Sequence, residues 1–112
     1  MREKELQFGL LLDFYGELIS DKRRNVLDLY YNNDYSLAEI SEQIGITRQG
    51  VLDSIKKGKE ELSFFEEKLN LAKRFEENEI AVQKIRAILS SEKTISDHAR
   101  KEINAILLAF LN

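Results

Sequence analysis

The sequence predicts an all-α protein, and three of its features lead to that expectation. Pro is absent, only 5 of the 112 residues are Gly, and 33% of the residues are charged. A chain with so few helix-breaking residues favours helices. Its apolar residues recur at spacings of three and four and do not alternate, so no sheet is expected. With 43% hydrophobic residues, the chain can form one ordinary core.

Two helices are expected before residue 36. The first is predicted over about residues 6–18, and the second after Ser20, whose side chain is an expected N-cap. The second should end at Asn32-Asn33-Asp34, because Asn and Asp tolerate turn conformations. The apolar face of the first helix is formed by Leu10, Leu11, Phe14 and Leu18, and that of the second by Val26, Leu27, Leu29 and Tyr30.

A helix-turn-helix is predicted over Ser36–Gly58. Ser36 and Glu39 have the spacing of a capping box. Gly45 is suited to the left-handed position that ends the first helix, and Thr47 should cap the second. The inward positions of both helices and of the turn are all apolar, namely Leu37, Ile40, Ile44, Ile46, Val51 and Ile55. This pattern fits two short helices that cross steeply through a tight turn.

A long helix and a C-terminal helix are expected after Lys59. The long helix is either one helix or two in line. Its apolar residues form a seam whose regular spacing slips near residues 76–79. The last helix should run from about residue 97 to 111. We therefore expect a helix-turn-helix part over residues 1–60 and a helical dimerisation part of the same domain over 61–112. A seam of about 30 residues would extend about 45 Å, which favours a homodimer over packing within one chain.

The outward face of the second motif helix predicts DNA binding. Its N-terminal side chains would reach base edges in the major groove, and its cations would contact phosphates. The expected base contacts are Arg48, Gln49 and Asp53. The expected phosphate contacts are Thr47, Lys56, Lys57 and Lys59, to which Lys22, Arg23 and Arg24 could add.

Two observations support other interpretations. The formal net charge is −3, although four basic residues stand against one acidic residue over residues 47–59. An acidic chain is atypical of a nucleic-acid binder, so the helix pair could instead be purely structural. Three tyrosines could stack on bases, but are more simply interpreted as residues at the edge of the core: Tyr30, Tyr31 and Tyr35.

No enzymatic signature is present in the sequence. Cys is absent and His98 is the only His, so no metal site, cofactor or nucleophile is expected. The longest apolar run, residues 105–111, is too short to span a bilayer. We therefore expect a cytoplasmic binding protein, without membrane insertion, rather than an enzyme.

Three stretches resemble the YlxM family of bacterial helix-turn-helix proteins. They are Leu12-Asp-Phe-Tyr-Gly-Glu-Leu18, the segment from Leu29 to Ser41, and Ile46-Thr-Arg-Gln-Gly-Val51 with Ile55-Lys-Lys57 after it. The same half of the chain is similar to the fourth conserved region of sigma factors, which reads promoter DNA. The resemblance implies a DNA-binding regulator linked to the signal recognition particle pathway. An adaptor that contacts RNA or protein of the targeting machinery is the alternative.

Two residues depart from the usual helix-turn-helix pattern. Ser41 stands where Ala is common at the helix crossing, so its hydroxyl needs a hydrogen-bond partner. Gly50 lies inside the predicted recognition helix, where it costs about 0.5–1 kcal/mol relative to Ala. Gly50 would either loosen this helix or allow a backbone to approach it closely.

Overall fold

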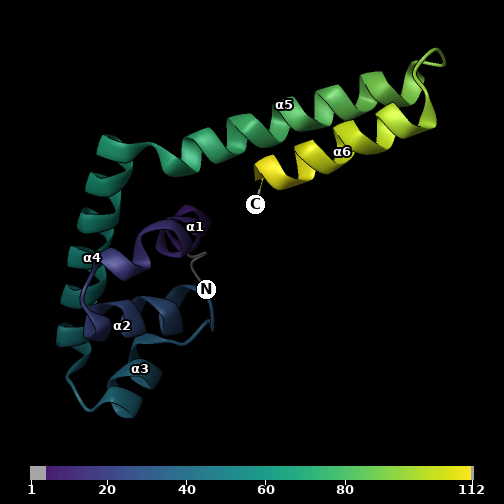
Figure 1. Ribbon diagram of the computed structural model, residues 1–112. Helices are drawn as coiled ribbons and strands as arrows, with labels where there is room; N and C mark the ends of the chain where they lie inside the picture. Colours follow the sequence, from purple (N-terminus) through teal and green to yellow (C-terminus); the bar gives the residue numbers. More distant parts are fainter. Residues whose placement is uncertain (1–4, 112) are drawn as a thin grey trace. The chain divides into compact units, whose positions relative to one another are not determined.

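The computed structural model describes residues 5–111, and these residues form helices and no strand (Figure 1). The helices are α1 (Leu6–Tyr15), α2 (Asp21–Tyr31), α3 (Leu37–Ile44), α4 (Arg48–Leu69), α5 (Leu71–Ser91) and α6 (Asp97–Leu111), with a short 3₁₀ turn, η1, over Gly16–Leu18. The all-α prediction is confirmed. The chain divides into two compact units, residues 1–72 and 73–112, here called the N-terminal unit and the hairpin unit.

The core of the N-terminal unit is formed by α1, α2, α3 and α4. Its buried side chains are Phe8, Leu12, Tyr15, Ile19, Val26, Leu27, Leu29, Ile40, Val51, Ile55 and Leu62. The predicted inner face of α1 was partly wrong, because Leu10 and Leu18 are exposed. The helix instead buries Phe8, Leu12 and Tyr15, which lie at spacings of four and three and so share one face.

The ends of α2 and α3 follow the predicted capping residues. The Ser20 side chain accepts a hydrogen bond from the Arg23 amide at 3.3 Å. Ser36 and Glu39 form both halves of the capping box, with distances of 3.1 and 3.0 Å. These bonds satisfy amides that have no partner inside the helix. The three tyrosines lie partly buried against the core, as one of the two interpretations expected: Tyr30, Tyr31 and Tyr35.

Helix α4 is longer than the sequence indicated. It continues past Lys59 to Leu69, so the predicted change of helix near residue 60 was wrong. Its end is set by Asn70, which is in the left-handed region with φ of 54°, a conformation that Asn adopts more readily than most residues. The seam is carried by two helices, as one of the two alternatives expected, but they separate at Asn70 and not at the slip in apolar spacing near residues 76–79, through which α5 is continuous. The expected division of function, with a helix-turn-helix part over residues 1–60 and a dimerisation part over residues 61–112, stays a prediction.

A buried hydrogen-bond group joins α1 to the α4–α5 junction within the N-terminal unit. The Tyr15 hydroxyl donates to Glu66 Oε1 at 2.6 Å and accepts from the Leu71 amide at 3.0 Å. Glu66 Oε1 also accepts from the Ala72 amide at 3.1 Å. Burial raises the pKa of the Tyr15 phenol, and the hydrogen bond with Glu66 raises it further. The pair satisfies the first amides of α5, so it defines where that helix starts.

The hairpin unit consists of most of α5 and of α6, which lie side by side and antiparallel (Figure 1). The predicted bounds of the last helix are confirmed, and Ser96 caps it by accepting from the Ala99 amide at 3.1 Å. Only Val82 and Leu89 are buried among the apolar residues of this unit that the structure describes. The hairpin therefore leaves most of its large apolar side chains exposed.

Candidate nucleic-acid interface

The turn between α3 and α4 has the predicted helix-turn-helix geometry. Gly45 ends α3 in the left-handed region with φ of 80°, and its amide donates to the Ser41 carbonyl at 2.9 Å. This conformation strains any residue with a Cβ, so Gly is suited to this position. The Ser41 hydroxyl donates to the Ile46 carbonyl at 2.5 Å. Ser41, which stands where Ala is common, thus supplies a hydrogen bond across the turn. Ile46 packs against the core.

Thr47 starts α4 by accepting a hydrogen bond from the Gly50 amide at 2.9 Å. At about 3.6 residues per turn, the buried residues Val51, Ile55 and Gly58 define the inner side of the helix. The predicted outward residues of its first three turns are all exposed: Arg48, Gln49, Leu52, Asp53, Lys56 and Lys57. The first turns of α4 therefore present a polar surface with an exposed leucine on it.

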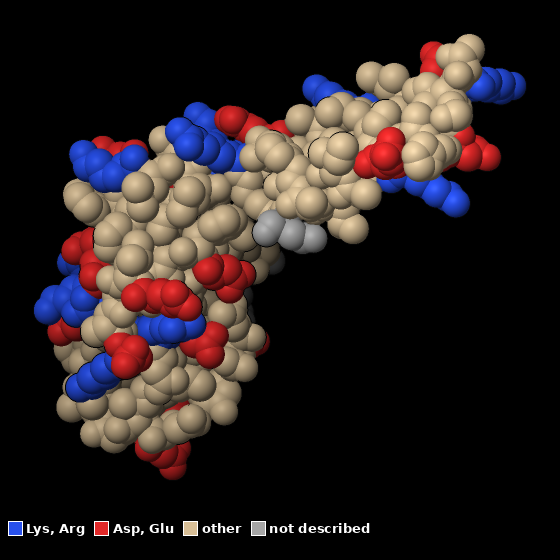
Figure 2. Space-filling view, in the orientation of Figure 1, with Lys and Arg blue, Asp and Glu red and all other residues tan. Residues whose placement is uncertain are grey.

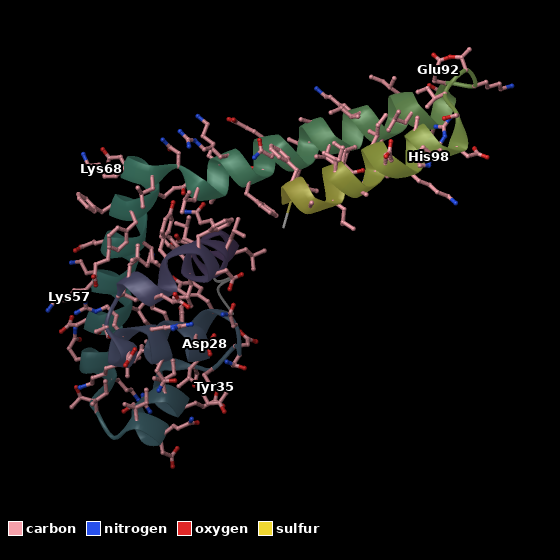
Figure 3. The ribbon with its side chains drawn as sticks, viewed as in Figure 1. Asp28, Tyr35, Lys57, Lys68, Glu92 and His98 are labelled. Atoms are coloured by element: carbon pink, nitrogen blue, oxygen red, sulfur yellow. The ribbon has the colours of Figure 1, made fainter. Side chains whose placement is uncertain are left out.

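The predicted contact residues differ in how they are held. Gln49 donates from Nε2 to Asp53 Oδ1 at 3.1 Å, so these two side chains form one unit on the helix surface. Three cations form no ion pair with any residue in the 5–111 range: Arg48, Lys56 and Lys57. Figure 3 shows Lys57 extending from α4 into solvent. These groups are available to an anion that approaches α4.

Lys59 is held differently from the other predicted phosphate contacts. Its ammonium lies 3.0 Å from Glu5 Oε1 and 5.0 Å from the ring centroid of Phe8. The side chain therefore reaches back to α1, and a phosphate would have to compete with a carboxylate and an aromatic face. Lys59 thus stands apart from the three unpaired cations.

The charge on this part of the molecule is mixed. Figure 2 shows basic and acidic side chains interspersed on the visible face of the N-terminal unit. The exposed outward face of α4, from Arg48 to Lys57, is here called its reading face, and it carries Asp53 between its cations. Electrostatic attraction to a polyanion would therefore come from a few specific side chains and not from a broad basic surface.

Sequence reasoning did not anticipate an apolar groove along α4. The groove encloses about 740 Å³ between α4 and the start of α1. Two of its residues are large and exposed, Leu52 at 46% and Phe64 at 54%. The signal was present in the sequence as apolar residues outside the inward stripe of α4, but only the packing of Phe8 against that side creates the groove.

A smaller cavity lies on the other flank of α4, where the start of α2 approaches its first turns (Figure 1). It encloses about 280 Å³. Side chains of both helices line it, among them Ser20, Lys22, Ser54 and Lys57. Ser54 was not singled out from the sequence, because a lone Ser in a helix carries no distinguishing signal.

Other candidate groups lie apart from this surface. His98 is exposed on α6, and its Nε2 lies 3.5 Å from Oε1 of Glu102, one helical turn away. Within residues 5–111, no cluster of three or more His, Cys, Asp or Glu side chains is placed to hold a metal ion. None of the helices in the described part of the chain is both long and apolar enough to cross a membrane.

Comparison with known proteins identifies the family to which this chain belongs. Residues 2–103 match the family described as "UPF0122: Putative helix-turn-helix protein, YlxM / p13 like". The chain belongs to the UPF0122 family. The predicted resemblance to YlxM proteins is thereby confirmed, and the match extends well beyond the three stretches that carry the resemblance.

Bacterial UPF0122 proteins are similar along much of their length. A UPF0122 protein of Caldanaerobacter subterraneus subsp. tengcongensis is 48% identical over 86 residues, which cover 77% of this chain and 74% of the relative. One of Thermoanaerobacter sp. strain X514 is 53% identical over 77 residues, or 69% and 66% of the two chains. One of Bacillus cereus strain AH187 is 37% identical over 106 residues, or 95% and 96%.

Proposed function

We propose that this UPF0122 protein is a DNA-binding regulatory protein that uses α4 as its recognition helix. The observation that carries the proposal is the exposed start of α4 after the tight turn at Gly45, with Arg48, Lys56 and Lys57 unpaired among residues 5–111. A helix so presented matches the way recognition helices enter the major groove.

The chemistry of the exposed side chains supports this role. Arg48 can pair with both acceptors of guanine, and Gln49 with the acceptor and donor of adenine. Because Gln49 is bonded to Asp53, the amide is already oriented on the helix surface. Lys56 and Lys57 supply phosphate contacts, which position a protein without specifying sequence.

Binding to genomic DNA fragments across a salt series tests the proposal. The chain should bind at low salt, with affinity that falls as salt rises because counterions are released. Arg48→Ala combined with Lys56→Ala should weaken binding, and the matched variant Lys101→Ala in the hairpin unit should not. A wild-type chain that binds no fragment at about 50 mM salt, a level at which phosphate contacts are strong, would overturn the proposal.

We further propose that the hairpin unit pairs with the hairpin of a second copy. Two helices that bury only Val82 and Leu89 cannot form a core alone, whereas four helices commonly do. The exposed apolar residues available for this pairing are Ile85, Ile88, Ile106, Leu108 and Phe110. A two-fold dimer would present two α4 helices to half-sites about 34 Å apart.

A second function, an adaptor in the signal recognition particle pathway, is favoured by two observations. The apolar groove with exposed Leu52 and Phe64 suits an amphipathic helix of a protein partner, and the net charge of −3 is low for a DNA binder. Binding to the RNA or the protein of that particle, with loss of binding in Leu52→Asp, would support the adaptor. Failure to bind either one would count against it.

Both functions describe a binding protein and not a catalyst. Each ligand, DNA or particle, is located in the bacterial cytoplasm, so the proposal places the protein there as well. The absence of Cys fits a reducing compartment.

A further inference from the structure

We infer that the cavity between the start of α2 and α4 is a binding site for a backbone phosphate of duplex DNA. The inference deepens the proposed function and rests on it, because it concerns the flank of the same recognition helix. The residues that would hold the phosphate are Lys22, Lys57, Ser20 and Ser54. We call this cavity the phosphate nook.

The side chains of the nook match the chemistry of a phosphate group. Lys22 and Lys57 line the nook, and neither is paired with a carboxylate of residues 5–111, so each can turn its ammonium group onto a bound phosphate. The Ser20 oxygen accepts from the Arg23 amide at 3.3 Å, which leaves its own O–H to donate elsewhere. The Ser54 hydroxyl bonds to no residue that the structure describes. Ammonium and hydroxyl donors are the groups that proteins use on phosphate oxygens.

Two charged neighbours limit which groups can serve. Arg23 lines the nook, but its Nη1 is already bonded to Glu61, so we assign it no phosphate contact. Asp53 also lines the nook and opposes an anion. Its carboxylate accepts from Gln49 at 3.1 Å, which orients one oxygen toward the reading face of α4. Two unpaired ammonium groups against one carboxylate leave the nook attractive to a phosphate.

The position of the nook on α4 gives it access to the DNA backbone. Gly50, Ser54 and Lys57 lie at spacings of four and three, so they form one stripe beside the outward residues Gln49 and Asp53. A helix about 10–12 Å in diameter fills a major groove about 12 Å wide, so its two flanks face the two strands. The flank with Lys57 would face one strand, and the flank with Leu52 the other.

Gly50 gives the nook room for a ligand. A Cβ at Gly50 would lie 3.2 Å from Thr47 Oγ1 and 3.7 Å from Ile46 Cδ1, at the wall of the cavity. Gly50 lines the nook, so we include in the inference that its missing side chain leaves a backbone phosphate free to approach the Ser54 and Lys57 side chains. Gly in an element interior often marks such a close approach.

The test is the salt dependence of duplex DNA binding by the full chain. Loss of one phosphate contact reduces the slope of log affinity against log salt by about 0.9. Lys22→Gln should therefore lower the slope by about 0.9 and Lys22→Gln with Lys57→Gln by about 1.8, with the same loss on unrelated sequences. The matched control is Lys68→Gln, which lies about 17 Å further along α4 at a rise of about 1.5 Å per residue.

A second variant tests the nook without a change of charge. Gly50→Ala should weaken DNA binding by more than its change in thermal midpoint explains, since Ala favours the helix and its Cβ would meet only the Thr47 hydroxyl closely, at 3.2 Å. The inference is overturned if the wild type binds with a salt-dependent slope and Lys22→Gln with Lys57→Gln keeps that slope. If the wild type itself shows no salt-dependent binding, the proposed function fails, and the inference fails with it. The two failures are distinguishable because the first is seen in the wild type and the second only in the double variant.

Discussion

The side chain of Leu27 on α2 lies where a Cβ atom of Gly58 on α4 would have to be. An ideal Cβ at Gly58 would lie 2.5 Å from Leu27 Cδ1 and 3.1 Å from its Cγ. Leu27 is fully buried, so its side chain could shift only against the close-packed side chains around it. The close packing of α2 on α4, and hence the placement of the nook between them, depends on this glycine.

Gly58→Ala should destabilise the N-terminal unit. The gain in helix propensity, about 0.5–1 kcal/mol, is smaller than the cost of overpacking a core, about 1–3 kcal/mol. The free energy of unfolding in urea measures the difference. Gly50→Ala is the matched control and should cost less, since the nearest atom to a Cβ there is Thr47 Oγ1 at 3.2 Å, against 2.5 Å to Leu27 Cδ1 at Gly58. Equal stability of the two variants would contradict the packing argument.

Tyr15→Phe should destabilise the junction at the start of α5. The change leaves the Leu71 amide without its acceptor and removes a donor from Glu66, a loss of about 1–3 kcal/mol for buried groups. Urea unfolding of the full chain measures the cost. In a double-mutant cycle with Glu66→Gln, the two costs should not add, because both residues belong to one hydrogen-bond group. Additive costs would show that the two side chains act independently.

Stability should fall at alkaline pH, partly through Tyr31. Burial and the nearby charges of Glu5 and Tyr30 raise the pKa of Tyr31 to about 12, whereas an unfolded tyrosine ionises near about 10. The folded-state pKa is the higher one, so this contribution is fully present below pH ~10 and is lost as pH rises toward ~12. Urea midpoints at a series of pH values should decline less steeply for Tyr31→Phe than for the wild type. Parallel declines would mean that Tyr31 ionises with the same pKa in both states.

Ile106→Asp should convert a dimer into single chains. The side chain is 68% exposed on α6, so the hairpin unit by itself should tolerate the charge, whereas a paired apolar face should not. Light scattering at micromolar concentration should give about twice the 13.0 kDa chain mass for the wild type and 13.0 kDa for the variant. Lys101→Asp, an exposed polar position on the same helix, should leave the mass unchanged. A wild-type mass of one chain would refute the dimer.

Asp53→Asn distinguishes two roles for this residue. The amide keeps an oxygen that can accept from Gln49, so the local geometry should persist. Removal of a negative charge beside the phosphate nook should raise affinity for all DNA sequences, most clearly at low salt. If Asp53 instead accepts from cytosine, the variant should lose discrimination among sequences at one position. Competition between a selected fragment and random DNA separates the two outcomes.

The sequence by itself determined the local features of this protein. Capping residues, the left-handed turn at Gly45 and the inward stripe of α4 depend on neighbours within a few positions, so they were predictable. The start of the last helix at Asp97 and the exposure of Arg48 on α4 follow from the same short-range rules.

Features that depend on distant residues were decided only by the tertiary structure. The inner face of α1 and the Tyr15–Glu66 pair rest on contacts between segments far apart in the sequence, 51 residues for the pair, and spacing along the chain carries no signal for them. The phosphate nook has the same origin. The sequence predicts Lys57 as a phosphate contact and Lys22 as a possible further one, but only the close packing of Leu27 against Gly58 brings α2 near enough to α4 for one phosphate to contact both.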